Sequence, residues 1–208
     1  MKSWTALRRA ALPASVHAAL LRSFASKRPP KAPLARDIEE WFHYSRAVVS
    51  GVPETFAEGA IRSNDPLDPI DLEKARGQHA AYVSELRKLV PEVVVMEPDA
   101  RYPDMVFVED PAVVLLDRAI INKIGHPTRE GESAKMQETL EEMGIETHHL
   151  QKIDPRATLD GGDVLFTGRE FLVGLSRRTN KASTIHTACC VLLLTKQDAH
   201  LSPCAVWR

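Results

Sequence analysis

The amino-acid sequence predicts an α/β fold in which short strands alternate with two amphipathic helices. Apolar residues recur with a 3.6-residue period in two segments, which indicates helices that pack on one side. Short apolar runs of strand length lie around them, and neither a G-x-G-x-x-G nor a Walker sequence follows any of these runs. The order is strand, helix, three strands, helix and two strands, with strands predicted at 45–50, 93–96, 112–116, 119–122, 145–150 and 170–173.

Capping residues mark the ends of both predicted helices. Asp68 is a good N-cap residue, Pro69 suits the first helical position, and Pro91 ends this first helix. The second helix covers 130–143, and Gly144 follows it as the C′ residue. The apolar side of the first helix, where we expect the histidine to be packed rather than to bind a ligand, contains Leu72, Ala75, His79, Tyr82, Val83, Leu86 and Leu89.

The stretch Pro103–Pro111 places acidic residues on both sides of a short apolar core. If it is a buried strand, Asp104 and Asp110 share a face but lie about 20 Å apart, with their carboxylates in solvent. If the prolines bend the chain instead, the carboxylates can form a pocket for a guanidinium, whose planar donors pair well with carboxylates. Both interpretations remain open from the pattern alone.

A second acidic stretch, 159–163, has the sequence LDGGD. Two adjacent glycines permit backbone angles that other residues avoid. The pair therefore predicts a tight turn, and such a turn can also bring a carboxylate to the edge of a site.

Charge is distributed unevenly along the 208 residues. Eight of the 27 Lys and Arg residues fall within 1–36, where there is no acid, so the remainder has 19 bases against 28 acids. An acidic body argues against nucleic acid as a partner. No apolar run reaches the roughly 20 residues that span a membrane. We therefore expect no membrane partner, and the sequence does not define an oligomeric state.

Residues 1–36 have the composition of a mitochondrial transit peptide, rich in Arg, Ala and Ser. A disordered extension is the alternative, with cytoplasmic localisation. Residues 37–180 form the predicted α/β domain, and 181–208 are a divergent tail in which 191–194 could add one edge strand. All three cysteines lie in this tail, so no disulfide can link the body of the protein, and a reducing compartment is expected.

Several segments together resemble the dimethylarginine dimethylaminohydrolases. They are RAVVSGVPETFAEGAIR, PDMVFVEDPAVV, HPTR and ATLDGGDVLFTGREFLVGLSRRTN, which fall within about Arg46–Asn180. The resemblance implies a pentein-type α/β propeller with pseudo-fivefold symmetry, of which this chain covers only a part, and in which strands such as 170–173 would lack neighbours. It also implies hydrolysis of asymmetric dimethylarginine and monomethylarginine to citrulline and an alkylamine, without a cofactor or a metal.

The same resemblance assigns roles to individual residues. A cysteine thiolate attacks the guanidinium carbon in this family, and a histidine transfers protons. His186 and His200 have unsuitable surroundings, and Cys189 is the candidate nucleophile only if the tail reaches the site. A catalytically inactive, truncated member of the family is therefore the alternative to an active enzyme. The remaining roles are guanidinium binding by Asp104, Glu109 and Asp110, carboxylate binding by Arg129 and Arg178, a mobile loop at Ile61, and orientation of the histidine by Asp160.

Overall fold

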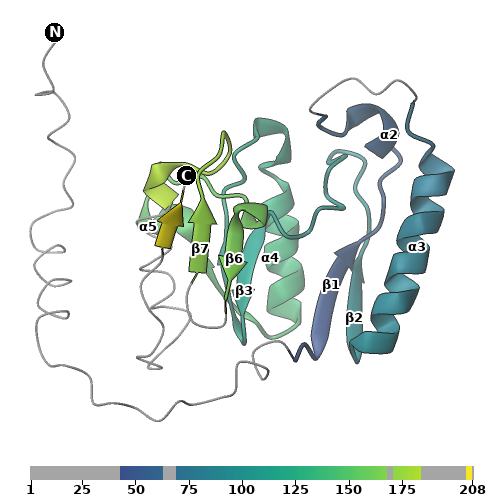
Figure 1. Cartoon of the computed structure of the whole chain (residues 1–208), viewed down its shortest axis with the longest axis horizontal. Helices are drawn as coiled ribbons and strands as arrows, with labels where there is room; N and C mark the ends of the chain where they lie inside the picture. The colour runs from purple at the N-terminus through teal and green to yellow at the C-terminus, as the bar shows by residue number, and fades with distance from the viewer. Residues whose placement is uncertain (1–42, 63–68, 168–170, 184–204, 208) are drawn as a thin grey trace, which may run out of the picture. The chain divides into compact units, whose positions relative to one another are not determined.

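The computed structural model describes residues 43–62, 69–167, 171–183 and 205–207 (Figure 1). All of them belong to one compact unit, Arg36–Arg208. The predictions for 1–36, for the strand at 191–194, and for His186, Cys189 and His200 lie outside the described residues.

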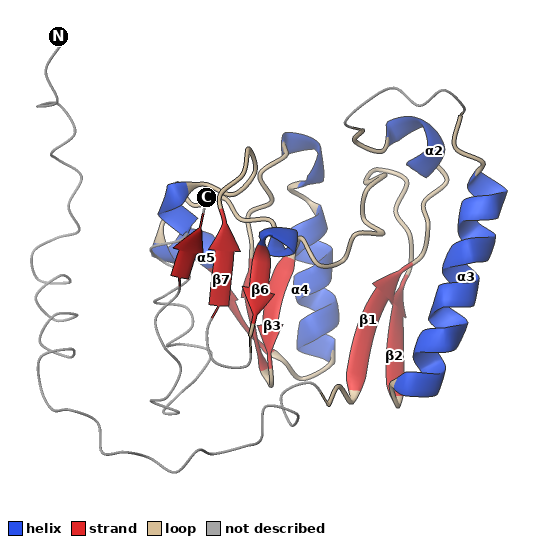
Figure 2. Ribbon diagram, in the orientation of Figure 1, coloured by secondary structure: helices blue, strands red, loops and turns tan. Residues whose placement is uncertain are grey.

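The first sheet joins two parallel strands. Strand β1 (Arg46–Ser50) pairs with β2 (Glu92–Met96) along its whole length, and the short helix α2 (Phe56–Gly59) and the long helix α3 (Leu72–Leu89) connect them. Figure 2 shows α3 beside this pair of strands. Two parallel neighbours need such a crossover connection, and a helix usually provides it.

Helix α3 begins later than the sequence predicts. Asp71 is its N-cap, and the Asp71 side chain accepts a hydrogen bond from the Lys74 amide at 2.9 Å, so the assignment of Asp68 was wrong. The predicted apolar side is also only partly covered. Val83 is buried, but Leu89 is 79% exposed, and His79 is half-buried with its ring 6.2 Å from that of Tyr82.

The second sheet has three strands and one covering helix. β3 (Ala112–Leu115) pairs antiparallel with β4 (Arg118–Ile121), and β4 pairs parallel with β5 (Glu146–His149). Helix α4 (Glu132–Glu142) connects β4 to β5, and Gly144 follows it with a φ of +77°, as its C′ position predicts. Met136 and Leu140 of α4 pack on Ala119 and Ile121 of β4 in one apolar cluster.

The third sheet repeats this pairing. After the short helix α5 (Leu150–Ile153), β6 (Val164–Phe166) pairs antiparallel with β7 (Phe171–Gly174), and β7 pairs parallel with β8 (Ala205–Trp207). The expectation that 170–173 lacks neighbours was therefore wrong, because β7 has a partner on each side. A buried cluster joins this sheet to the second one through Leu115, Ile120, Leu150, Ala157, Leu159, Phe171 and Val173.

Residues 102–110, named here the acid turns, do not form a strand. The amides of Met105, Phe107 and Asp110 each bond the carbonyl three residues earlier, at 3.1, 3.0 and 3.5 Å. The local bonds replace a strand ladder, so the buried-strand interpretation was wrong and the chain bends as the alternative required. Within the described ranges, no helix has the length and apolar character needed to cross a membrane.

Candidate active site

Arg129 is the centre of a buried ionic cluster. It ends a short 3₁₀ turn, Pro127–Arg129, which begins with proline and directly precedes α4. Its Nη1 lies 2.5 Å from Asp110 Oδ2, and its Nε and Nη2 bond the two oxygens of Glu132 at 2.9 and 2.7 Å. Nη2 also donates to the carbonyl of Asp104 at 3.1 Å and to that of Phe107 at 3.3 Å. One guanidinium thus links α4 to the acid turns.

Asp110 joins the acid turns to the LDGGD segment. Its Oδ1 accepts a hydrogen bond from the Gly162 amide at 3.1 Å, and its carbonyl accepts one from the Gly161 amide at 3.1 Å. The Asn122 side chain donates to the same carbonyl at 2.9 Å. Gly161 is necessary here, because a Cβ at this position would overlap the carbonyl oxygen of Glu109. The predicted tight turn therefore does bring its backbone to an acidic site.

Asp104 is a buried carboxylate with no cation at ion-pair distance among the residues that the structure describes. It is 3% exposed, and both of its oxygens accept from the Ile61 amide, at 3.1 and 3.2 Å. Arg129 reaches the Asp104 carbonyl rather than its side chain. The Asp104 carboxylate therefore remains available to a cationic ligand.

The electrostatics of the cluster show an excess of negative charge. Burial alone would lower the pKa of Arg129, but Glu132 and then Asp110 outweigh it and raise that pKa above the ordinary arginine value. Burial raises the pKa of Glu132, although Arg129 opposes this shift. The two directions agree physically, because Arg129 forms ion pairs with two carboxylates, those of Asp110 and Glu132. The Asp104 carboxylate acts on Glu132 through its charge, while Arg129 bonds only the Asp104 carbonyl, so the carboxylates outnumber the one cation. Such a cluster favours a second cation.

Asp160 and Arg178 form a second ionic pair next to this cluster. Asp160 is buried, and its Oδ1 accepts from the Gly125 amide at 2.8 Å. Its Oδ2 lies 2.9 Å from Arg178 Nε, but the geometry makes an ion pair without a hydrogen bond. Burial raises the pKa of Asp160, against the opposing hydrogen bond from Gly125. Asp160 Oδ2 can therefore still accept a hydrogen bond.

Of the predicted site residues, Asp104 and Asp110 lie together around Arg129. Glu109 and Ile61 are exposed beside them, and Arg178 has 43% of its side chain exposed. Arg129 is 2% exposed, with most of its donors bound to protein groups rather than presented to a ligand.

Sequence reasoning missed Glu132, which pairs with Arg129. A signal for it was present, because residues three apart face each other at the start of a helix. In the described part of the chain, no group of three or more His, Cys, Asp or Glu residues could hold a metal ion.

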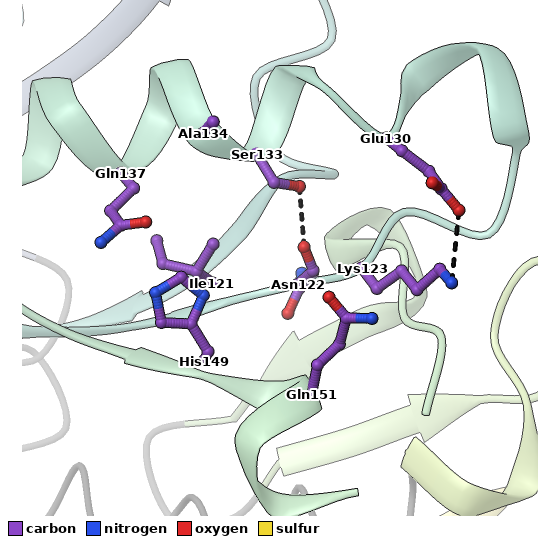
Figure 3. A pocket seen from close by; sticks show the side chains of 9 residues that line it. All are labelled: Ile121, Asn122, Lys123, Glu130, Ser133, Ala134, Gln137, His149 and Gln151. Atoms are coloured by element: carbon purple, nitrogen blue, oxygen red, sulfur yellow. Dashed lines mark hydrogen bonds and ion pairs between the residues drawn. The ribbon is translucent and has the colours of Figure 1, made fainter. Parts of the chain in front are cut away.

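A separate cavity of about 240 Å³ lies between α4 and the ends of β4 and β5 (Figure 3). Lys123 and Glu130, 3.3 Å apart, lie at one end, and Gln137 and His149 lie at the other. Burial, followed by the charge of Lys152, lowers the pKa of His149. The predicted site residues do not line this cavity.

Small sheets of antiparallel and parallel pairing, with buried carboxylates among their connecting turns, make this an α/β protein, and they agree with the pentein-type fold that the resemblance implies. Comparison with known proteins gives the family. The model of eukaryotic N,N dimethylarginine dimethylhydrolase matches residues 54–191, and the chain belongs to this family. The match extends past Asn180, where the resemblance was expected to end.

Relatives and solved structures agree with this assignment. Putative hydrolase DDAH2 from Bos taurus is 38% identical over 137 residues, which are 65% of this chain and 47% of that protein. N(G),N(G)-dimethylarginine dimethylaminohydrolase from Pseudomonas aeruginosa is 36% identical over 110 residues, 53% of this chain and 42% of that protein. The chain thus spans about half the length of the curated relatives it matches.

Among solved structures, a mutant of the Pseudomonas aeruginosa enzyme in complex with citrulline superimposes with a TM-score of 0.70 at 28% identity. The superposition covers 80% of this chain and 62% of that one. The N-terminal domain of ArgZ, a cyanobacterial arginine dihydrolase, gives a TM-score of 0.58 at 20% identity, and this second likeness concerns the fold alone.

Proposed function

We propose that this chain binds the guanidinium group of methylated arginine at Asp104 and Asp110. The observation that supports this proposal most directly is Asp104, a buried carboxylate with no cation partner among the described residues. A buried charge is costly unless it is paired, so a site that maintains one is suited to a cationic ligand. The exposed Glu109 lies next to Asp110 in the chain and adds a third carboxylate beside the buried pair.

The proposed reaction is hydrolysis of asymmetric dimethylarginine or monomethylarginine to citrulline and dimethylamine or methylamine. A thiolate adds to the guanidinium carbon, the protonated amine leaves, and water then releases citrulline and regenerates the thiol. Such turnover would support nitric oxide signalling by removing methylated arginines. Asp160 is suited to orient the histidine in this reaction, because its buried Oδ2 has no hydrogen bond and could accept one from an imidazole.

The proposal has two forms, an active enzyme and a protein that only binds its ligand, and they differ in whether a nucleophile reaches the site. Cys189 lies outside the described residues, so the geometry of the site supports binding more directly than hydrolysis. The alternative is a catalytically inactive member of the family that binds methylated arginine without converting it. Arg178 is the better candidate for the ligand carboxylate, because 43% of its side chain is exposed although it pairs with Asp160. Arg129 is buried between its two partners, Asp110 and Glu132.

Binding and turnover can be tested separately. Isothermal titration of the 208-residue chain with asymmetric dimethylarginine measures binding, and citrulline serves as a ligand of similar shape whose side chain is uncharged. We expect Asp104→Asn to weaken binding by about 10- to 150-fold, because a charge-assisted hydrogen bond contributes about 1.5–3 kcal/mol. Asp117→Asn is the matched control, since the Asp117 side chain is 78% exposed and lies outside the site.

Equal affinity for citrulline and dimethylarginine would contradict the proposal, as would unchanged binding by Asp104→Asn. Release of citrulline from dimethylarginine distinguishes the enzyme from the binding-only form. Loss of that release in Cys189→Ser would identify the nucleophile.

A further inference from the structure

Glu132 has no role in the proposed reaction, yet it is one of the most buried charged residues described. It is 3% exposed and forms the first residue of α4. Its two carboxylate oxygens bond Arg129 Nε and Nη2, at 2.9 and 2.7 Å. We propose that Glu132 is a positioning residue of the guanidinium site, which fixes Arg129 and, through it, the carboxylate of Asp110.

The planarity of the arginine group explains how Glu132 acts at a distance. A carboxylate that binds two nitrogens of one guanidinium fixes both the plane and the rotation of that group. The remaining nitrogen, Nη1, then points in a defined direction, and Asp110 Oδ2 lies there at 2.5 Å. Glu132 therefore determines where the Asp110 carboxylate is held, because Arg129 binds both carboxylates.

Other contacts of Arg129 do not replace this restraint. The carbonyls of Asp104 and Phe107 both accept from Nη2, so they hold one nitrogen and leave rotation about it open. The Phe107 ring lies 6.0 Å from the guanidinium carbon, and such a contact is tolerant of rotation. Without the bidentate pair, the long arginine side chain would gain freedom and Asp110 would lose its fixed partner.

The position of the Asp110 carboxylate also affects the LDGGD segment. Asp110 uses its other oxygen, Oδ1, to accept from the Gly162 amide at 3.1 Å. A displaced Asp110 weakens this bond, so the Gly162 amide reports the state of a carboxylate two contacts away from Glu132. The proposal rests on the proposed function only for its effect on the ligand, since the chain of contacts exists without one.

The first test follows hydrogen exchange by NMR in three proteins: wild type, Glu132→Gln and Glu138→Gln. Glutamine keeps the shape of the side chain and loses its charge, and Glu138 is an exposed residue of the same helix. In Glu132→Gln we expect the Arg129 Nε–H and the Gly162 amide to exchange faster by about tenfold or more. This factor corresponds to the loss of one charge-assisted hydrogen bond. In Glu138→Gln both rates should match the wild type.

The second test measures affinity for asymmetric dimethylarginine by titration, below the thermal transition of each protein. Glu132→Gln should bind about tenfold more weakly, and Glu138→Gln within about twofold of wild type. A merely structural role would lower the midpoint of thermal unfolding of Glu132→Gln but leave the affinity of the folded protein unchanged. That result would overturn the proposal, as would wild-type exchange at both reporter groups.

Glu132→Asp keeps the test decisive if Glu132→Gln fails to fold. The shorter side chain retains the charge but cannot hold both nitrogens at the same distance, so exchange at Gly162 should fall between wild type and an unrestrained site. Wild-type exchange in this variant would also overturn the proposal. If the wild-type chain binds no dimethylarginine, the proposed function is wrong, while exchange at Gly162 still decides the role of Glu132.

Discussion

The Gly162 amide donates a hydrogen bond to Asp110 Oδ1 at 3.1 Å and joins two segments that are 52 residues apart. The neighbouring Gly161 amide donates to the Asp110 carbonyl. The backbone of the glycine pair therefore lies directly against the acid turns, and it can do so only because Gly161 has no side chain. The fold and the candidate site are mutually dependent at this point.

We predict opposite effects of alanine at two glycines. Gly161→Ala places a methyl group onto the Glu109 carbonyl, and overpacking of this kind costs about 1–3 kcal/mol. Gly77→Ala should raise stability by up to about 1 kcal/mol, because Gly77 lies in α3 with nothing within 4 Å of its added Cβ. Urea unfolding of the two variants checks both signs, and a stabilised Gly161→Ala would contradict the described approach of the two segments.

Removal of the central cation should destabilise the domain strongly. Arg129→Met leaves Asp110 and Glu132 buried without their partner, a loss of about 3–5 kcal/mol in comparable pairs. Arg87→Met is the matched control, since Arg87 is an exposed residue of the last turn of α3. The measurement is the free energy of unfolding in urea, and equal values for the two variants would show that the cluster does not contribute.

Asp160 gives a pH dependence of defined sign. Burial raises its pKa in the folded protein above the ordinary value of 3.8, so the folded state binds a proton more readily than the unfolded state. As pH falls from neutrality through the raised pKa, the stability contributed by this group therefore rises, until both states are protonated below about 3.8.

The comparison with Asp160→Asn isolates this effect. The stability of wild type relative to Asp160→Asn should increase as the pH is lowered from 7 toward 4, measured by urea unfolding at each pH. Glu132, whose pKa is also raised, is present in both proteins, so its contribution cancels. A relative stability that falls over this range would mean that Arg178 outweighs burial at Asp160.

The basic segment at the start of the chain predicts mitochondrial import. Residues 1–36 contain eight bases and no acid. Fused to a fluorescent reporter, they should direct it to mitochondria, and replacement of the three arginines Arg8, Arg9 and Arg22 by glutamine should abolish import, because import depends on their positive charge. A reporter that stays in the cytosol with the native segment would support the cytoplasmic alternative.

Features that depend on local chemistry could be predicted from the amino-acid sequence. The apolar periodicity predicted the body of α3, and Pro91 lies just beyond its end. Glycine at the C′ position predicted the positive φ of Gly144 after α4. The family followed from several short motifs with their spacing, and the family model confirms it. The same motifs predicted Asp104 and Asp110 as site residues, although the pattern left two conformations open.

Only the tertiary structure decided how those residues are used. The acid turns take local i to i−3 hydrogen bonds instead of a strand, and Arg129 lies between Asp110 and Glu132. The start of α3 at Leu72 and the pairing of β7 with β8 were likewise not predictable. The physical reason is that each outcome depends on partners distant in sequence: a buried carboxylate must find a cation, and a strand edge must find a neighbour, wherever the chain supplies one.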